Sequence, residues 1–283
     1  PGTADWQTRL LAAPLSGGIR YNGPADTLFS LAALADQSVS GNIGVAADFS
    51  GLVRSPRLTG VVRANDLVYE NDVYGTRLTQ LRVRGVFTND QLEVTELSAK
   101  AGKGTISGKG IISLSSAKGF PVQLNLDMQN ARLARSEMIA TEATGSLSIT
   151  NTAEGGALVS GTLILPETRY KIVRQGAAQV ATLTGIRRKA PSGRARVSGD
   201  ADAISSLPSK WRLDIKLVAN DELYVSGMGL ESEWSANLRV TGTSDTPTIA
   251  GDMQLIRGTL GFAGRSFELE SGRLTFPGGA FTN

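Results

Sequence analysis

Four short motifs carry residue types and spacings that could do chemistry. Gly102 to Gly110 (GKGTISGKG) could cradle phosphate, but its spacing fits neither the dinucleotide fingerprint nor the P-loop, and no helix is predicted after it. Ser115 and Lys118 have the spacing of a lysine-activated serine, but they fall in a predicted turn instead of a helix. Asp200-Ala-Asp202 is too short for a calcium loop. None of these three motifs predicts a functional site.

The fourth motif is the carboxylate pair Glu268 and Glu270, which share one face of a predicted strand. No apolar pocket is predicted around them, so they indicate a solvated face. The chain has no histidine and no cysteine, which removes the commonest general base and makes a zinc site untenable. The sequence therefore predicts no enzyme, no cofactor and no metal.

The charge balance gives no sign of a nucleic-acid partner. The chain has 29 Lys and Arg against 26 Asp and Glu, a net charge of +3. A nucleic-acid-binding domain is usually far more basic. Hydrophobic residues make up 41% of the chain, so a large apolar surface must be buried or occupied.

Residues 245–279 predict β-strands separated by glycine turns. Pro247 suits the first position of a strand, and small or apolar residues alternate from Ile249 to Leu255. The phase then slips at Ile256, which predicts a β-bulge or a tight hairpin. Turns at 263–266 and 271–272 predict two further short strands.

Most of the remaining sequence has the same pattern of short strands and turns. The clearest amphipathic strands are residues 122–128 and 211–217, in which apolar side chains alternate with polar ones. Asn89-Asp90 predicts a hairpin turn. The 33 glycines are scattered without a period, which fits many strand ends and turns.

Two segments predict helix instead. Residues 26–36 place apolar side chains on one helical face, with Asp26 as the capping residue. This helix would either touch a membrane or cover an apolar edge of the sheet. Residues 131–140 predict one further turn of helix.

Residues 175–206 predict a flexible basic loop. Arg187, Arg188 and Lys189 lie at its centre. One interpretation is that they contact anionic lipid headgroups. The other is an ordinary solvated loop, which is favoured because no aromatic anchor is interleaved with them.

The predicted fold class is all-β, with residues 1–283 as one β-rich unit. Because the chain starts at Pro1 and carries no signal peptide or transmembrane run, we expect a fragment of a longer protein whose membrane anchor lies outside it. Strands with one apolar face allow two arrangements: two sheets that fill a common core, or one curled sheet with an open apolar groove. Periodicity alone does not choose between them.

Several motifs occur in a characteristic order. They are Leu163-Ile-Leu-Pro-Glu-Thr-Arg-Tyr-Lys-Ile172, Gly185-Ile-Arg-Arg188, Pro247-x-Ile-x-Gly251, Arg257-Gly-Thr-Leu260 and Phe267-Glu-Leu-Glu-Ser-Gly-Arg-Leu-Thr-Phe276. This series resembles the C-terminal region of the TamB family and, more broadly, the AsmA-like group. The resemblance implies an elongated, curled, antiparallel-rich sheet (a β-taco) with an apolar interior.

The resemblance also implies a function and a location. It implies a periplasmic segment of a protein anchored in the inner membrane of a Gram-negative bacterium, with a TamA-like outer-membrane barrel as partner. The leading hypothesis is that the groove carries phospholipid acyl chains between the two membranes. The alternatives are a scaffold or chaperone for outer-membrane protein (autotransporter) assembly that binds client β-strands or the barrel partner, and a filled β-sandwich that acts only as a spacer.

On the leading hypothesis, the apolar residues of the amphipathic strands line the groove. These predicted lining residues are Val122, Leu124, Leu126, Met128, Trp211, Leu213, Ile215, Leu217, Leu238, Val240, Leu255, Phe267 and Leu269.

Overall fold

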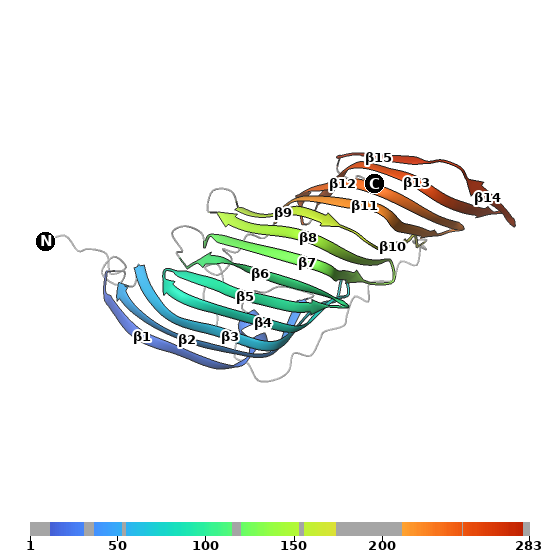
Figure 1. Cartoon of the computed structure of the whole chain (residues 1–283). Coiled ribbons are helices and arrows are strands. Elements are labelled where there is room, and N and C mark those ends of the chain that lie inside the picture. Colours follow the sequence, from blue (N-terminus) through green and yellow to red (C-terminus); the bar gives the residue numbers. More distant parts are fainter. Residues whose placement is uncertain are drawn as a thin grey trace, which may run out of the picture.

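The protein forms one long β-sheet (Figure 1). The structure is a computed structural model that describes residues 12–30, 37–52, 55–114, 120–152, 156–173, 211–244 and 246–279. Every strand of these residues belongs to a single 15-stranded sheet. The strands follow the order of the chain across the sheet, so each hairpin adds to the edge that the previous one left open. The prediction of an all-β, antiparallel-rich sheet is confirmed.

The strands are long in the body of the sheet and short at its C-terminal edge. Their bounds are β1 Pro14–Pro24, β2 Gln37–Leu52, β3 Ser55–Asn71, β4 Thr76–Asn89, β5 Gln91–Ala101, β6 Gly104–Ser113, β7 Val122–Arg135, β8 Ile139–Thr152, β9 Gly156–Ile164, β10 Thr168–Lys171, β11 Arg212–Gly227, β12 Leu230–Thr243, β13 Pro247–Phe262, β14 Arg265–Leu269 and β15 Arg273–Pro277.

The described residues contain one short α-helix, α2, at Ala25–Phe29. It overlaps the predicted helix at residues 26–29, and residues 31–36 of that prediction fall outside the described part of the chain. The predicted cap is wrong: Pro24 occupies the N-cap position without a side-chain hydrogen bond, and Asp26 lies in the first turn. Helix in 131–140 is also wrong, because β7 runs to Arg135 and a turn at 136–138 leads into β8.

Local features predicted at the C-terminal end are confirmed. The register between β12 and β13 shifts between Glu233 and Trp234, which pair with Arg257 and Leu255 and leave Ile256 unpaired in a bulge. The strands β14 and β15 both pair with β13, at its two ends.

The predicted hairpin turn at Asn89-Asp90 is also present. Asn89, the last residue of β4, adopts a left-handed φ of 56°, as this turn requires.

One interruption breaks the antiparallel order. The short strands β9 and β10 lie end to end between β8 and β11, antiparallel to β8 and parallel to β11. Lys171 ends β10 beside Ser226, whereas Arg212 begins β11 beside Leu158. The chain therefore leaves β10 at one rim of the sheet and enters β11 at the opposite rim, as a parallel connection requires.

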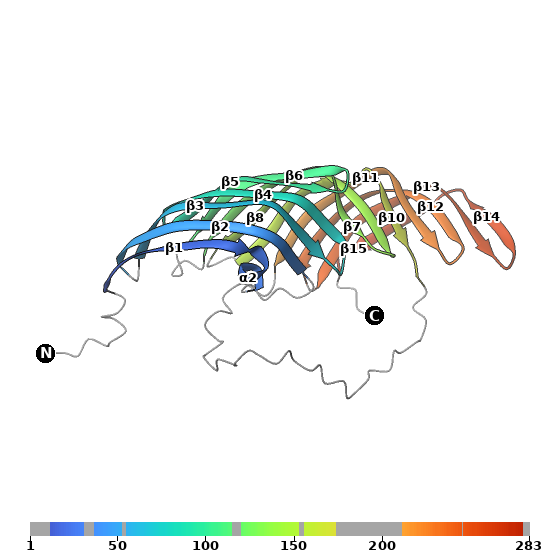
Figure 2. The same cartoon turned by 90° about the horizontal axis from the view of Figure 1, so that it is seen from below.

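The sheet is strongly curved into an arch (Figure 2). Its strands cross the arch, so that the hollow runs along the series of strands from β1 to β14. The helix α2 lies under the arch at the N-terminal end, where Ala25 packs with Ala64 and Leu67. We call the hollow face the trough face and the opposite one the convex face.

Glycines in the middle of strands allow neighbouring strands to approach closely. Gly60 in β3 and Gly251 in β13 adopt φ values of 153° and 123°. A Cβ atom at either position would overlap a backbone carbonyl oxygen of the adjacent strand, that of Ala46 or of Asn237. The scattered glycines are therefore not confined to strand ends and turns.

Replacing Gly251 by alanine is expected to destabilise the sheet by at least about 2 kcal/mol, because the added Cβ meets backbone and the φ value strains an L-residue. Thermal unfolding followed by circular dichroism measures the effect as a lower melting temperature. Gly279→Ala is the matched control, since nothing lies within 4 Å of a Cβ there. Equal melting temperatures for the two variants would contradict the close-approach argument.

Candidate functional site

Apolar side chains form continuous rows across the trough face. Residues that pair directly on neighbouring strands share a face of the sheet, so the register traces each row. In one row every member from β1 to β13 is apolar or glycine. Its members are Gly23, Ile43, Ala64, Val83, Leu97, Gly108, Leu126, Leu147, Gly161, Ile215, Val240 and Ile249.

The row two residues along each strand has the same character. Its members are Tyr21, Val45, Val62, Gly85, Val94, Gly110, Leu124, Ile149, Val159, Leu213, Gly242 and Pro247. A third row on the same face runs through Met128, Leu163, Leu217 and Leu238. The apolar surface is thus a continuous strip and not a set of separate patches.

The convex face is more polar, although it also carries Val61, Val86 and Ile111. The row that lies one residue away consists of Lys109, Asn125, Ser148, Ser160, Asp214, Thr241 and Thr248. Because the side-chain period of a strand is two, this polar row faces away from the apolar rows.

The register brings together nearly all the predicted lining residues. The three apolar rows contain Leu124, Leu126, Met128, Leu213, Ile215, Leu217, Leu238 and Val240. Val122 continues the alternation on β7, and Leu255 packs with Trp234. Phe267 and Leu269 pair with Leu260 and Gly258, which extend the trough face beyond the bulge.

Other predicted residues lie at the margin or outside the described chain. Trp211 directly precedes β11 and is 38% exposed. Arg187, Arg188 and Lys189, together with the predicted flexible loop at 175–206, lie outside the described residues. The sequence prediction missed the N-terminal half of the trough face, for example Ile43, Val62 and Val83, although these residues also alternate with polar ones.

Glycines let large side chains lie flat against the floor of the trough. A Cβ on Gly108 would lie 2.6 Å from Cδ2 of Leu126, its partner on the next strand. A Cβ on Gly85 would lie 2.9 Å from side-chain atoms of both Leu92 and Val62. Large side chains therefore occupy the space above the neighbouring glycines.

Within the described residues, the side chains of the trough floor pack mainly against one another. Its buried residues form three clusters along the sheet, centred on Leu67, Met128 and Trp234. Among the described residues, no large side chain is fully buried. Many lining residues are half-buried, so they retain surface that a further apolar group could cover.

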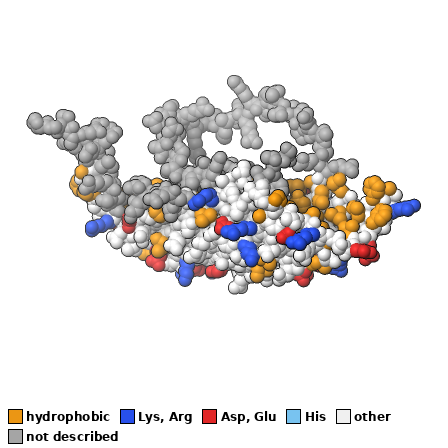
Figure 3. Space-filling view, turned by 90° about the horizontal axis from the view of Figure 1, so that it is seen from above, with side chains coloured by type: hydrophobic (Ala, Val, Ile, Leu, Met, Phe, Trp, Pro, Cys, Tyr) orange, Lys and Arg blue, Asp and Glu red, His pale blue; other side chains and the backbone are white. Residues whose placement is uncertain are grey.

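Exposed apolar side chains gather at the C-terminal end of the sheet (Figure 3). Phe262, at the β13–β14 turn, is 71% exposed, and Phe267 and Leu260 beside it are also exposed. Charged side chains are instead spread along the convex side. The trough is therefore apolar up to its C-terminal end.

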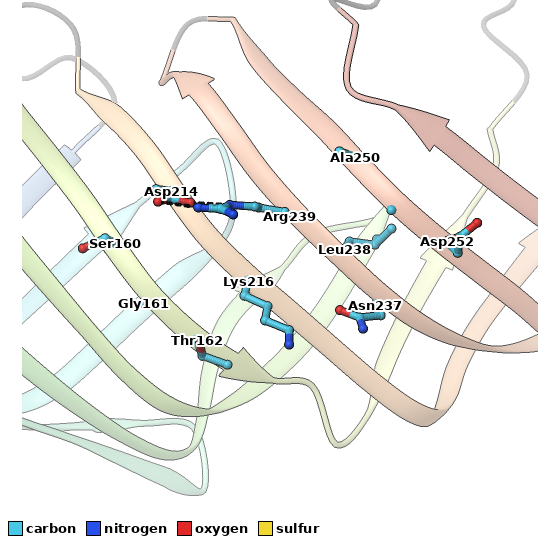
Figure 4. Close-up of a pocket in the computed structure, with 11 residues that line it drawn as sticks. Ser160, Gly161, Thr162, Asp214, Lys216, Asn237, Leu238, Arg239, Ala250 and Asp252 are labelled. Atoms are coloured by element: carbon cyan, nitrogen blue, oxygen red, sulfur yellow. Dashed lines mark hydrogen bonds and ion pairs between the residues drawn. The ribbon is translucent and has the colours of Figure 1, made fainter.

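A polar depression lies on the convex face (Figure 4). It has a volume of about 700 Å³ and lies over β9, β11, β12 and β13. Arg239 donates two hydrogen bonds to the Asp214 carboxylate, at 2.6 and 2.8 Å, and these bonds hold the pKa of Asp214 below its ordinary value. Hydrogen bonds from Thr275 and Arg273 likewise lower the pKa of Asp252. Paired charges of this kind stabilise a surface and provide no activated base.

The part of the chain described by the structure offers no metal centre. It contains no group of three or more acidic, histidine or cysteine side chains that could hold an ion. No helix among these residues is long and apolar enough to cross a membrane. The feature of the described chain that is left to explain is therefore the trough.

Comparison with known proteins identifies one match. The family model of the TamB C-terminal domain matches residues 94–283. No curated protein and no solved structure matches the chain. The matched residues run from β5 through the C-terminal strands and include all the predicted lining residues.

The pKa of the Asp214 carboxyl is expected to lie below its ordinary value of 3.8 in the native protein and to rise in Arg239→Gln, because the hydrogen bond from Arg239 is the main cause of the shift. A lowered pKa means that the pair stabilises the fold above the ordinary value and that this contribution is lost as the pH falls through the native pKa. Carboxyl ¹³C NMR measures both midpoints. A native midpoint at or above 3.8 would show that the pair does not form in solution.

Proposed function

The chain belongs to the TamB C-terminal domain family, and we propose that its trough carries phospholipid acyl chains between the inner and outer membranes without catalysis. The family is that of a translocation and assembly module that works with a TamA-type outer-membrane partner. Membership supports a role in outer-membrane transport or assembly and a periplasmic location in a protein anchored in the inner membrane. Phospholipid as the cargo is our proposal.

The continuous apolar rows are the observation that carries this proposal. The sheet has 13 successive strand positions, and at about 4.8 Å between strands the trough extends roughly 60 Å. One leaflet of a bilayer core is only about 15 Å thick, half of the roughly 30 Å of hydrocarbon. The trough is therefore several acyl chains long, which suits a path better than a single binding pocket.

The uniform lining favours movement along this path. Each buried CH₂ group is stabilised by about 0.8 kcal/mol wherever it lies in the trough. When an acyl chain slides by one strand, it exchanges apolar contacts with that strand for equivalent contacts with the next, so no position traps it. A charged side chain in the floor would interrupt the path, because an unpaired charge is costly in apolar surroundings.

The position of lipid can be tested with a photo-crosslinking amino acid. Ile215 lies on the trough face, whereas Lys216, the next residue of β11, is exposed on the convex face. Benzoylphenylalanine at 215 is expected to crosslink to phospholipid in cells, with at least about tenfold more adduct than at 216. Mass spectrometry of the purified protein measures the adducts.

A second pair of variants tests whether the trough holds phospholipid. Ile215→Asp should abolish co-purified phospholipid, and Lys216→Glu should leave it unchanged, because only the first change places a charge in the trough. Circular dichroism confirms that both variants fold. Equal lipid occupancy in both variants, together with equal crosslinking at both positions, would refute the proposed lining.

A role in protein assembly is the second candidate, and the open edges of the sheet favour it. Within the described residues, β1 pairs only with β2, and β14 pairs only with β13. Each edge therefore presents unpaired backbone groups that could accept a client strand or a strand of the outer-membrane partner.

Strand pairing makes a different prediction from lipid binding. A peptide from an outer-membrane β-strand should bind the protein, and the same peptide with alternate N-methylated amides should bind at least about tenfold more weakly, because methylation removes the backbone donors. Fluorescence anisotropy measures both affinities. Equal binding of the two peptides would exclude strand addition and point to hydrophobic contact alone.

A further inference from the structure

A small basic pocket lies on the convex face at one rim of the sheet. We call this rim the tyrosine rim; it is formed by the turns at 72–75, 102–103, 136–138, 228–229 and 263–264, together with the end of β10. The pocket has a volume of about 310 Å³. It is lined by Lys103, Arg132, Ala134, Arg135, Ala140, Thr141, Glu142, Glu167 and Arg169.

The pocket has more cations than carboxylates. Its two carboxylates are already paired: Glu142 with Arg132 at 3.2 Å, and Glu167 with Arg169 at 2.7 Å. Within the described residues, Lys103 and Arg135 form no ion pair. These two side chains give the pocket a net positive charge that an anion could neutralise.

Backbone contacts fix the walls of the pocket. The hairpin of β5 and β6 ends early at this rim, so the β3–β4 turn reaches β7 directly: the Arg135 N–H donates to the Tyr74 carbonyl at 2.9 Å. Gly75 makes this approach possible, because a Cβ there would overlap the Arg135 carbonyl oxygen. The Arg132 side chain lies across Gly102, where a Cβ would be 3.0 Å from it. The cations are therefore held by the fold and are not merely close in sequence.

The trough reaches the same rim on the other side of the sheet. Leu133, between two pocket residues of β7, packs against the core cluster around Met128. Ile139, Tyr170 and Val225 form a row beside it on the trough face. At about 3.3 Å per residue, the cations of β7 and this apolar surface lie within about 10 Å of each other along the strand. Tyr74 and Met138 at the rim are exposed as well.

We propose that this pocket binds a phosphate group and that, where the proposed function holds, the group is the headgroup phosphate of a phospholipid whose acyl chains pass over the tyrosine rim into the trough. Arginine guanidinium groups bind phosphate oxygens in a fork, and lysine adds a point charge. The ion pairs with Glu142 and Glu167 orient two of the arginines, which leaves Lys103 and Arg135 to meet the anion.

Calorimetric titration with inorganic phosphate tests the pocket. The double variant Lys103→Glu with Arg135→Glu is expected to bind phosphate at least about tenfold more weakly than the native protein. The charge-matched control is Arg82→Glu with Lys216→Glu, two exposed cations outside the pocket, and it should bind as the native protein does. No binding by the native protein, or equal loss in both double variants, would overturn the proposal.

A second titration identifies the source of the phosphate. Dihexanoyl phosphatidylglycerol below its micelle concentration should bind the native protein at least about tenfold more tightly than inorganic phosphate, since its chains add apolar contact. In Val225→Asp, which places a charge on the trough face beside Tyr170 and near the pocket, this advantage should disappear while phosphate still binds. Equal affinity of the native protein for the lipid and for phosphate would assign the pocket to free phosphate and count against the lipid trough. If only the pocket double variant loses phosphate binding, the phosphate site is supported even when the lipid result is negative.

Discussion

The structure depends on one constraint: a single layer of strands satisfies its own backbone, and the described residues leave most of its apolar face open. Each strand pairs with its neighbours along most of its length, so hydrogen bonds hold the sheet together from β1 to β14. In an ordinary sandwich a second sheet would cover the apolar side chains. Here, among the described residues, only α2 packs against that face, and only at one end. The apolar surface that the described residues leave open suits an apolar occupant, and this connects the fold to its proposed cargo.

Continuity of the trough face is maintained where the pairing changes. If β13 kept strict alternation after Leu255, Gly258 and Leu260 would lie on the convex face. Because Ile256 is an extra residue in a bulge, both lie on the trough face and pair there with Leu269 and Phe267. The end-to-end strands β9 and β10 similarly fill one position of the sheet and keep Leu163 in register with Leu217. Irregularities in the strands thus preserve a regular apolar surface.

The sequence predicts the strands better than it predicts the surfaces they make. Period-two alternation in 122–128 and 211–217 identifies which side chains share a face within one strand, and the structure agrees. The rows across strands depend on register, which no single segment encodes. Residues 131–140 show the limit: register shifts after Met128 and after Arg132 break the alternation, so an Ala- and Arg-rich stretch suggests helix although it forms β7 and a turn. The rim pocket was missed for the same reason, because its cations come from separate turns and strands.

The composition of the trough also determines where selectivity could arise. A floor of Leu, Ile, Val and Gly binds CH₂ groups of any acyl chain with nearly the same free energy, so it cannot distinguish one lipid from another. Distinction requires polar contacts, and these occur where a headgroup leaves the apolar strip, at the rims of the sheet. Within the described residues, the tyrosine rim places two cations without an ion-pair partner, Lys103 and Arg135, within a few residues of the trough floor. A lipid held there by its phosphate would be retained more strongly than elsewhere along the trough, so the same contact that selects a headgroup would also slow its passage.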